Sequence, residues 1–319
     1  MNKEGNKLTI GKHFNENIIV PSDVKILKFH DEGVFNKLID FKNCISLKEI
    51  FFGKEFNQSF TVPSSVEKIY FDHRSVFNKE ITFPEDCKLK LIEFGKEYNK
   101  KLVVQPCIKK IRFFWSSVFN KEIIFPIDSK IKVIEFGIEF NKRLNLPSSL
   151  KQLIFTPESK FNREITFHDI GTAKLDWIEF GENFNEDIVL PDGVKYMVFT
   201  DDSVFNKKIT LPRSLESIEF GAKFNQDIVV SPRLRYIRFS KYGDFMAKID
   251  IPEKNRLEDI NLNFYWKGTI KITKKMKEIH FYDLENVSFE CHKKMIFYIY
   301  REEYGEENEP YAMKIKNIS

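Results

Sequence analysis

Residues 140–155 decide the fold, and they read FNKRLNLPSSLKQLIF. Apolar residues alternate with polar ones twice, first at Leu144 and Leu146 and then in the L-x-x-L-x-F segment that ends at Phe155. A period of two is typical of a β-strand with one buried face. Pro147 separates the two alternations, and a residue that lacks a backbone N–H marks the end of a strand. The stretch therefore predicts two strands joined at a corner.

The same pattern returns along the chain, and each return begins with a Phe-Asn or Tyr-Asn pair, which we call the landmark pair. The first eight pairs recur at a regular step of about 21 residues, a period typical of stacked coils. The step that ends at Phe184 is slightly longer, and the step that ends at Phe224 is slightly shorter. Because the L-x-x-L-x-F spacing resembles that of leucine-rich repeats, we expect an all-β, leucine-rich-repeat-like solenoid of about 13 coils. The landmark pairs are Phe14-Asn15, Phe35-Asn36, Phe56-Asn57, Phe77-Asn78, Tyr98-Asn99, Phe119-Asn120, Phe140-Asn141, Phe161-Asn162, Phe184-Asn185, Phe205-Asn206 and Phe224-Asn225.

Two kinds of coil alternate within this rhythm. Coils whose strand ends in Phe-Gly leave three residues before the next landmark, as between Phe94 and Tyr98. The intervening coils leave five, as between Phe71 and Phe77. The Phe-Gly coils compensate with a longer segment between the proline and the strand. The sequence therefore predicts a paired unit of two coils, about 42 residues in length.

The ends of the array depart from the pattern. We predict a repeat solenoid over residues 1–282, with an N-terminal half-coil from about residue 8, and a degenerate last coil with a C-terminal cap over residues 283–319. An uncovered sheet edge invites aggregation, so a cap is expected. The alternative is that the C-terminal end is a self-association surface.

These residues resemble the FNIP repeat family, a leucine-rich-repeat-like group abundant in social amoebae and giant viruses. The likeness rests on Phe-Asn, an Ile two or three residues later, Pro-Ser-Ser-Leu, and a strand ending in Phe-Gly, over residues 8–270. The resemblance implies a repeat scaffold, and members that carry an F-box ahead of the repeats would be ubiquitin-ligase adaptors. Here the first coil begins by residue 8, so we carry over the repeat array alone.

The landmark residues are expected to be scaffold. The aromatic ring should fill the core and stack on the ring of the next coil, where burial contributes about 1.5–3 kcal/mol. The asparagine amide can satisfy backbone groups at a tight bend, so these amides should form a ladder along the array. The alternative is a ligand-binding role for the asparagines.

The L-x-x-L-x-F pattern also indicates which side chains lie on the open face of the main sheet. A basic stripe with nearby aromatic residues suits a protein interface, because Arg and large aromatics are its usual anchors. The alternatives are a solvated face with a Glu93–Arg112–Glu135 charge run, or single-stranded nucleic acid, which we do not expect because no RNA-binding motif is present. The candidate protein-binding residues are Lys90, Lys109, Lys110, Arg112, Lys132, Lys151, Trp177, Tyr196 and Tyr236.

The sequence gives no indication of catalysis or of a cofactor. The six histidines occupy unrelated coil positions, and no nucleotide-binding, zinc-protease or nucleophile-elbow motif is present. Cys291-His292 lacks the four ligands of a structural zinc site, so no metal is expected. The cysteines are expected to be free thiols, with a Cys87–Cys107 disulfide as the alternative.

These observations favour a non-enzymatic module that binds an unidentified protein partner. The net charge of +4, from 51 basic and 47 acidic residues, is nearly balanced. We find no secretory signal and no apolar run of membrane-spanning length. We therefore expect an intracellular, cytoplasmic protein (host cytoplasm or virion if the source is viral). The alternative function is a structural component, for instance of a viral particle, that assembles through its solenoid ends.

Overall fold

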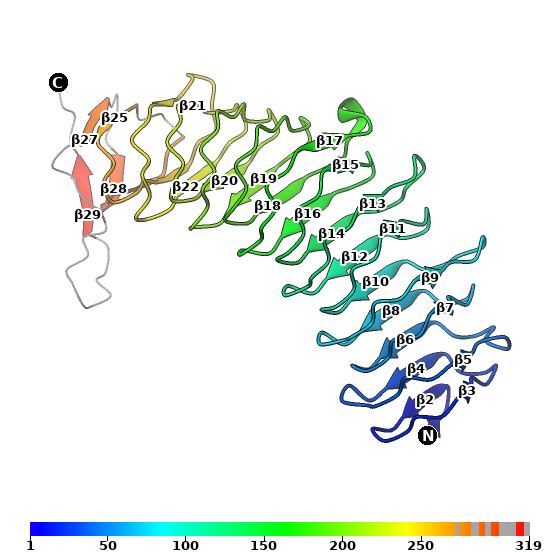
Figure 1. Ribbon diagram of the computed structural model, residues 1–319. Helices are drawn as coiled ribbons and strands as arrows, with labels where there is room; N and C mark the ends of the chain where they lie inside the picture. The colour runs from blue at the N-terminus through cyan, green and yellow to red at the C-terminus, as the bar shows by residue number, and fades with distance from the viewer. Residues whose placement is uncertain (272, 274, 282–286, 291–294, 300–310, 316–319) are drawn as a thin grey trace. The chain divides into compact units, whose positions relative to one another are not determined.

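The computed structural model describes residues 1–319 except 272, 274, 282–286, 291–294, 300–310 and 316–319 (Figure 1). The chain forms two compact units. The N-terminal unit contains residues 1–161 and 165–169, and the C-terminal unit contains residues 162–164 and 170–319. The domain boundary predicted after residue 282 falls outside the described residues and stays a prediction.

The N-terminal unit is a stack of coils that each contribute one strand to a parallel main sheet. Every four-residue main-sheet strand from β4 to β16 has its second and fourth residues buried, as the period-two alternation predicted. β1 (Asn2–Glu4) pairs antiparallel with β2 at the end of this sheet. The main-sheet strands are β2 (Lys7–Ile10), β4 (Ile26–Phe29), β6 (Glu49–Phe52), β8 (Lys68–Phe71), β10 (Leu91–Phe94), β12 (Lys110–Phe113), β14 (Val133–Phe136) and β16 (Gln152–Phe155).

A second row of short strands lies beyond the prolines, and its members pair two by two. The pairs are β3 (Ile18–Ile19) with β5 (Ile39–Asp40), β7 (Phe60–Thr61) with β9 (Ile81–Thr82), β11 (Leu102–Val103) with β13 (Ile123–Ile124), and β15 (Leu144–Leu146) with β17 (Ile165–Phe167). Each pair joins two consecutive coils, so the structure contains the two-coil unit that the sequence predicted.

The C-terminal unit continues the same plan. The 3-10 helix η1 (Ile170–Thr172) fills the longer corner of the step that ends at Phe184. β29 (Tyr311–Ile315) turns back antiparallel on β28. The parallel main-sheet strands are β18 (Trp177–Phe180), β19 (Tyr196–Phe199), β20 (Ser217–Phe220), β22 (Tyr236–Phe239), β24 (Asp259–Asn261), β26 (Glu278–Phe281) and β28 (Met295–Ile299). The short strands are β21 (Ile228–Val229) with β23 (Ile249–Asp250), and β25 (Gly268–Lys271) with β27 (Val287–Glu290).

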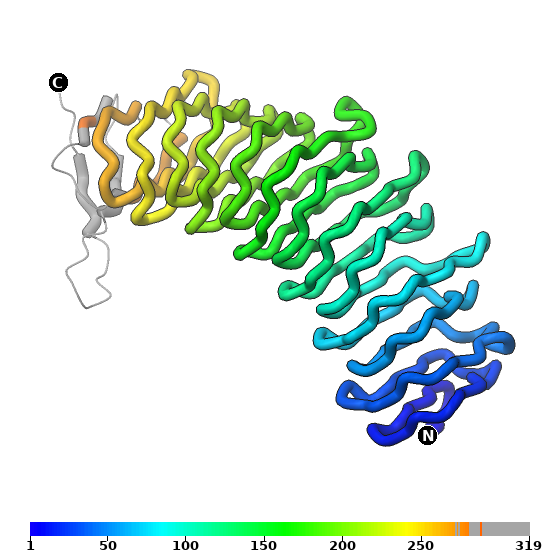
Figure 2. Tube along the Cα trace, in the orientation of Figure 1, coloured from blue at the N-terminus to red at the C-terminus, as the bar shows by residue number. Residues whose placement is uncertain are grey.

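The architecture confirms the predicted fold class, an all-β solenoid of about 13 turns with a ~21-residue period. The Cα trace shows successive coils stacked directly on one another within each unit (Figure 2). Within the described residues, no helix combines the length and apolar character needed to cross a membrane.

Aromatic columns form the core beneath the main sheet. The landmark rings of Phe56, Phe77 and Tyr98 stack at 6.0 Å between successive centroids with interplanar angles of 2° and 3°. Within one coil, the strand Phe94 packs on Tyr98 at 3.9 Å. The parallel register places Phe94 beside Phe113, so each ring meets a ring of the same kind one coil away.

The landmark asparagines form a ladder of hydrogen bonds along the bend. The backbone N–H of Asn120 donates to Oδ1 of Asn99 at 2.9 Å, and the N–H of Asn141 donates to Oδ1 of Asn120 at 3.0 Å. The same bond recurs at 2.9–3.0 Å from Asn36 to Asn99. In the C-terminal unit it runs from Asn185 to Met246. Each amide thus satisfies a backbone donor that the sheets do not reach.

A glycine–serine contact explains why two kinds of coil alternate. Ser117 is fully buried, and its hydroxyl accepts the N–H of Phe119 at 3.2 Å. Gly137 of the next coil lies directly against it, because a Cβ there would meet the carbonyl oxygen of Phe114 and come within 2.9 Å of Ser117 Cβ. Gly95 meets Ser75 in the same way. At these two steps the Phe-Gly coil therefore closes on a coil that places a buried serine at its corner.

We expect Gly137→Ala to destabilise the fold by about 1–3 kcal/mol, because the new methyl group overlaps a backbone carbonyl that cannot move aside. Gly11→Ala is the matched control, since nothing lies within 4 Å of a Cβ at that position. The measurement is the urea midpoint of each variant. Equal midpoints for the two variants would refute the close approach of the coils at Gly137.

Asn120→Ala should cost about 1–3 kcal/mol, because it leaves the N–H of Asn141 without its acceptor. The control is Asn145→Ala, which removes an exposed amide that accepts from the Thr166 hydroxyl at 3.2 Å. Chemical denaturation followed by circular dichroism measures both. A loss no greater than that of Asn145→Ala would show that the ladder contributes nothing at this step.

Candidate functional site

One row of side chains crosses the exposed face of the main sheet in the N-terminal unit. We call it the central row. It occupies the third position of each strand. Because side chains alternate between the two faces of a sheet, this position points away from the buried second and fourth residues. Each member is the register partner of the next. From β6 to β16 the row is Phe51, Tyr70, Glu93, Arg112, Glu135 and Ile154.

The first part of the central row is aromatic. The rings of Phe51 and Tyr70 stack at 4.6 Å with an interplanar angle of 9°. The ammonium group of Lys28 lies 6.0 Å from the centre of the Phe51 ring, within reach of a cation–π attraction. Burial raises the pKa of the Tyr70 hydroxyl, so this group stays protonated at neutral pH and can donate a hydrogen bond. The pair offers a flat apolar surface with one polar tip.

The second part of the row is a clamp of opposite charges. Arg112 Nε donates to Glu135 Oε2 at 2.5 Å, and Arg112 Nη1 donates to Glu93 Oε1 at 3.3 Å. Lys110 Nζ lies 2.7 Å from Glu135 Oε1. Burial alone would raise the pKa of Glu135, but the hydrogen bonds from Arg112 and Lys110 outweigh it and hold that pKa below its usual range. The carboxylate is therefore ionised and fixed in place.

The predicted basic stripe is only partly a free positive surface. Lys90 forms an ion pair with Glu67 at 2.5 Å, and Lys110 and Arg112 belong to the clamp. Lys132 donates to the backbone carbonyl of Ser149 at 3.3 Å. Lys109 and Lys151 are exposed to solvent. The charge-paired alternative thus describes Lys90, Lys110 and Arg112, and the use of the stripe in binding stays a prediction.

The three predicted aromatic residues lie in the C-terminal unit, whereas the basic stripe belongs to the N-terminal unit. The rings of Trp177 and Tyr196 are 5.0 Å apart, and Trp177 Nε1–H donates to Glu179 at 2.6 Å. The guanidinium of Arg235 lies 5.1 Å from the centre of the Tyr236 ring. The nine candidates therefore form two groups, six basic residues in one unit and three aromatic residues in the other.

Sequence reasoning did not include Phe51 and Tyr70 among the candidates. The signal was present, because two consecutive coils carry an aromatic residue immediately before the strand phenylalanine. In a parallel sheet, equal positions in neighbouring coils lie side by side at about 4.8 Å. Two such residues therefore had to form a stacked pair on the open face.

A hollow of about 820 Å³ beside β5 and β7 is a further concave feature of the N-terminal unit. Its lining includes Phe41, Cys44, Phe60 and Val62. Burial raises the pKa of the Cys44 thiol to about 11, so the sulfur is not an activated nucleophile. Cys44, Cys87 and Cys107 are free thiols, and the Cys87–Cys107 disulfide is not formed.

Comparison with known proteins agrees with this architecture. The FNIP repeat model matches residues 205–242, which confirms the resemblance inferred from the sequence. Curated proteins gave no match. A solved structure described as CroV588, a novel circular LRR protein from a giant virus, superposes with a TM-score of 0.56 at 23% identity, over 90% of this chain and 54% of that chain.

The likeness to CroV588 shows a leucine-rich-repeat-like fold, and the chain spans about half of the length of that protein. The pneumococcal vaccine antigen PcpA matches with a TM-score of 0.31 at 16% identity, over 92% of this chain and 96% of that chain. A likeness at that level carries no structural argument.

The clamp predicts acid sensitivity. Because the pKa of Glu135 is lower in the folded chain than the unfolded value of about 4.3, its ion pairs stabilise the fold above that pH. The contribution is lost as the pH falls through the folded value. We expect Glu135→Gln to lower the urea midpoint at neutral pH and to make it less dependent on pH in the acid range.

The control for this measurement is Glu122→Gln, which removes an exposed carboxylate whose partner is Lys101. Its midpoint should follow the wild-type pH profile closely, because exposed ion pairs contribute little. If Glu135→Gln keeps the full acid dependence of the wild type, the clamp does not stabilise the fold electrostatically.

Proposed function

We propose that this FNIP-repeat solenoid is a non-enzymatic module that binds a protein through the exposed main-sheet face of its N-terminal unit. The observation that supports it is the central row, in which Glu93 alone separates the stacked pair Phe51 and Tyr70 from the clamped Arg112. Aromatic residues and arginine are the residues that dominate binding energy at protein interfaces. FNIP and leucine-rich-repeat-like families are typically non-enzymatic.

The rigidity of the row favours binding. Arg112 is held between Glu93 and Glu135, and the aromatic rings are stacked before any partner arrives. Side chains that are already ordered lose little conformational entropy on association, which otherwise costs about 0.5–1.5 kcal/mol for each immobilised long side chain. The face is therefore pre-organised for a partner of complementary shape.

The charges beside the row suggest the chemistry of the partner. Lys109 is exposed directly before β12, the strand of Arg112, and Lys151 is exposed directly before β16, two coils further along. Acidic side chains around an apolar or aromatic anchor would match them, and such complementarity raises the association rate and favours one docking orientation. We propose that the partner presents such an acidic rim. The free thiols support action in a reducing intracellular compartment, which would be host cytoplasm or a virion if the source is viral.

A second candidate function is assembly through the solenoid ends. The chain matches 54% of a protein described as circular, so two copies would supply about the length of that chain. The first edge of the main sheet is a reason to rank assembly second. β1 covers the first edge with three exposed residues, among them Lys3 and Glu4, and short charged edge strands discourage further pairing.

The test uses a face variant, Phe51→Ser, Tyr70→Ser, Lys109→Glu and Lys151→Glu, in affinity capture from the native cell. The matched control changes exposed residues outside the main sheet: Val103→Ser, Ile127→Ser, Lys121→Glu and Lys130→Glu. We expect the control to recover the wild-type partner and the face variant to bind it about tenfold more weakly or worse. Titration calorimetry with the purified partner measures the difference.

Equal partner affinity for the wild type and the face variant would remove this surface as the binding site. Light scattering at micromolar concentration tests the second candidate function, assembly through the solenoid ends. A mass of 37.9 kDa is that of one chain and argues against assembly through the ends, whereas a doubled mass would favour it.

A further inference from the structure

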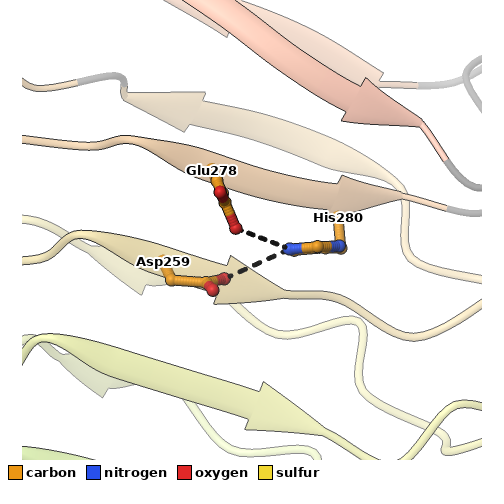
Figure 3. A group of neighbouring side chains, drawn as sticks. All are labelled: Asp259, Glu278 and His280. Atoms are coloured by element: carbon orange, nitrogen blue, oxygen red, sulfur yellow. Dashed lines mark ion pairs between the residues drawn. The ribbon is translucent and has the colours of Figure 1, made fainter. Parts of the chain in front are cut away.

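A cluster of polar side chains lies on the exposed face of the C-terminal unit, where β24 and β26 run side by side. Asp259 is the register partner of Glu278, and Asn261 is the register partner of His280. Figure 3 shows the imidazole of His280 with one nitrogen facing both carboxylates. His280 Nε2 lies 3.7 Å from Asp259 Oδ1 and 3.6 Å from Glu278 Oε2.

The two carboxylates are not fully compensated. They occupy directly opposed positions on neighbouring strands, where like charges destabilise a sheet. The basic residue on the adjacent strand β22 is Arg238, which contacts Asp201 at 3.4 Å and Glu219 at 3.5 Å. A cation at the cluster would remove the repulsion between the carboxylates.

A fourth candidate donor atom is the amide oxygen of Asn261, the register partner of His280. Among the described residues, Oδ1 of Asn261 is buried and has no hydrogen-bond partner. A buried acceptor left unpaired costs free energy, and an amide oxygen is a ligand that divalent ions accept. This oxygen is an observation separate from the charge cluster, and it also favours a positive ligand at this place.

We propose that Asp259, Glu278 and His280 form a binding site for one divalent transition-metal ion of the Zn²⁺ type, with Asn261 as a neighbouring oxygen donor. Imidazole and carboxylate oxygen bind Zn²⁺ at about 2.0–2.2 Å, which places tetrahedral ligand atoms about 3.4 Å apart. The three ligand atoms here lie within 4.8 Å of one another. Small side-chain rotations close that difference. Three protein ligands leave one position for water.

The site goes beyond the proposed protein-binding face and is independent of it, because its residues lie in the other unit. The sequence had indicated no metal, since a search for adjacent ligands found only Cys291-His292. The E-x-H pair at Glu278 and His280 becomes a candidate only when the coil register places Asp259 beside it.

The test is calorimetric titration of Zn²⁺ into the metal-free full chain in a non-chelating buffer. Cys87, Cys107 and Cys291 are changed to Ser in the background, which removes competing thiolates. We expect one equivalent to bind. His280→Ala should abolish this binding, and Glu278→Gln and Asp259→Asn should each weaken it by about tenfold or more.

The matched control is the double variant Asp202→Asn and Glu253→Gln, which removes two exposed carboxylates of the same unit outside the trio. It should bind Zn²⁺ like the background protein. Co²⁺ gives a second readout, because nitrogen and oxygen ligands produce weak visible bands without the intense near-ultraviolet band of thiolate coordination. Circular dichroism checks that each variant is folded, and Glu278→Gln changes the side-chain volume very little.

Two results would overturn the proposal. One is the absence of saturable Zn²⁺ binding by the background protein, which would mean that the trio holds no metal ion. The other is unchanged affinity in folded His280→Ala or Glu278→Gln, which would place the metal elsewhere on the chain. Neither result bears on the N-terminal face, whose partner affinity is measured without added metal.

Discussion

The hydrogen bond from each landmark backbone N–H to the preceding asparagine Oδ1 is the constraint on which the coils depend. Its length stays at 2.9 Å across the longer step to Asn185 and across the shorter step to Asn225. Extra or missing residues are therefore accommodated in the corners, as at η1. The distance between successive asparagine bends stays the same. A polar side chain that satisfies a backbone donor in every coil sets the rise of the solenoid.

Because the spacing between coils is constant, equivalent residues of successive coils stay side by side along the solenoid. The other regularities follow from this. The landmark rings can stack nearly parallel, as Phe56 and Phe77 do at 2°. Coils come so close at one corner that only glycine fits beside a buried serine, as at Gly95 and Ser75. The two-coil unit is thus a packing requirement of two complementary corners, and the paired short strands are its backbone counterpart.

Periodicity explains how much could be predicted. The strands, the aromatic columns and the asparagine ladder follow from spacing alone, because every coil repeats the same environment. The clamp at Arg112 was visible as a charge run, since register partners are read from equal positions. The ion pair between Lys90 and Glu67 could not be predicted from the sequence, because side-chain torsions decide which neighbouring residue a long lysine reaches. The His280 cluster was missed because it needs positions from two coils after the landmark pairs have decayed.

The same physics limits where function can lie on such a chain. An interior side chain touches an equivalent residue on both sides, so one change disturbs two interfaces and the interior stays uniform. A side chain on the open face of the sheet meets neighbours about 4.8 Å away and solvent above, so it can vary at little cost. The places where the exposed face departs from simple charge alternation therefore indicate where function lies. Phe51 with Tyr70, and His280 between its carboxylates, are such departures, and each puts unlike chemistry on a scaffold that is otherwise constant.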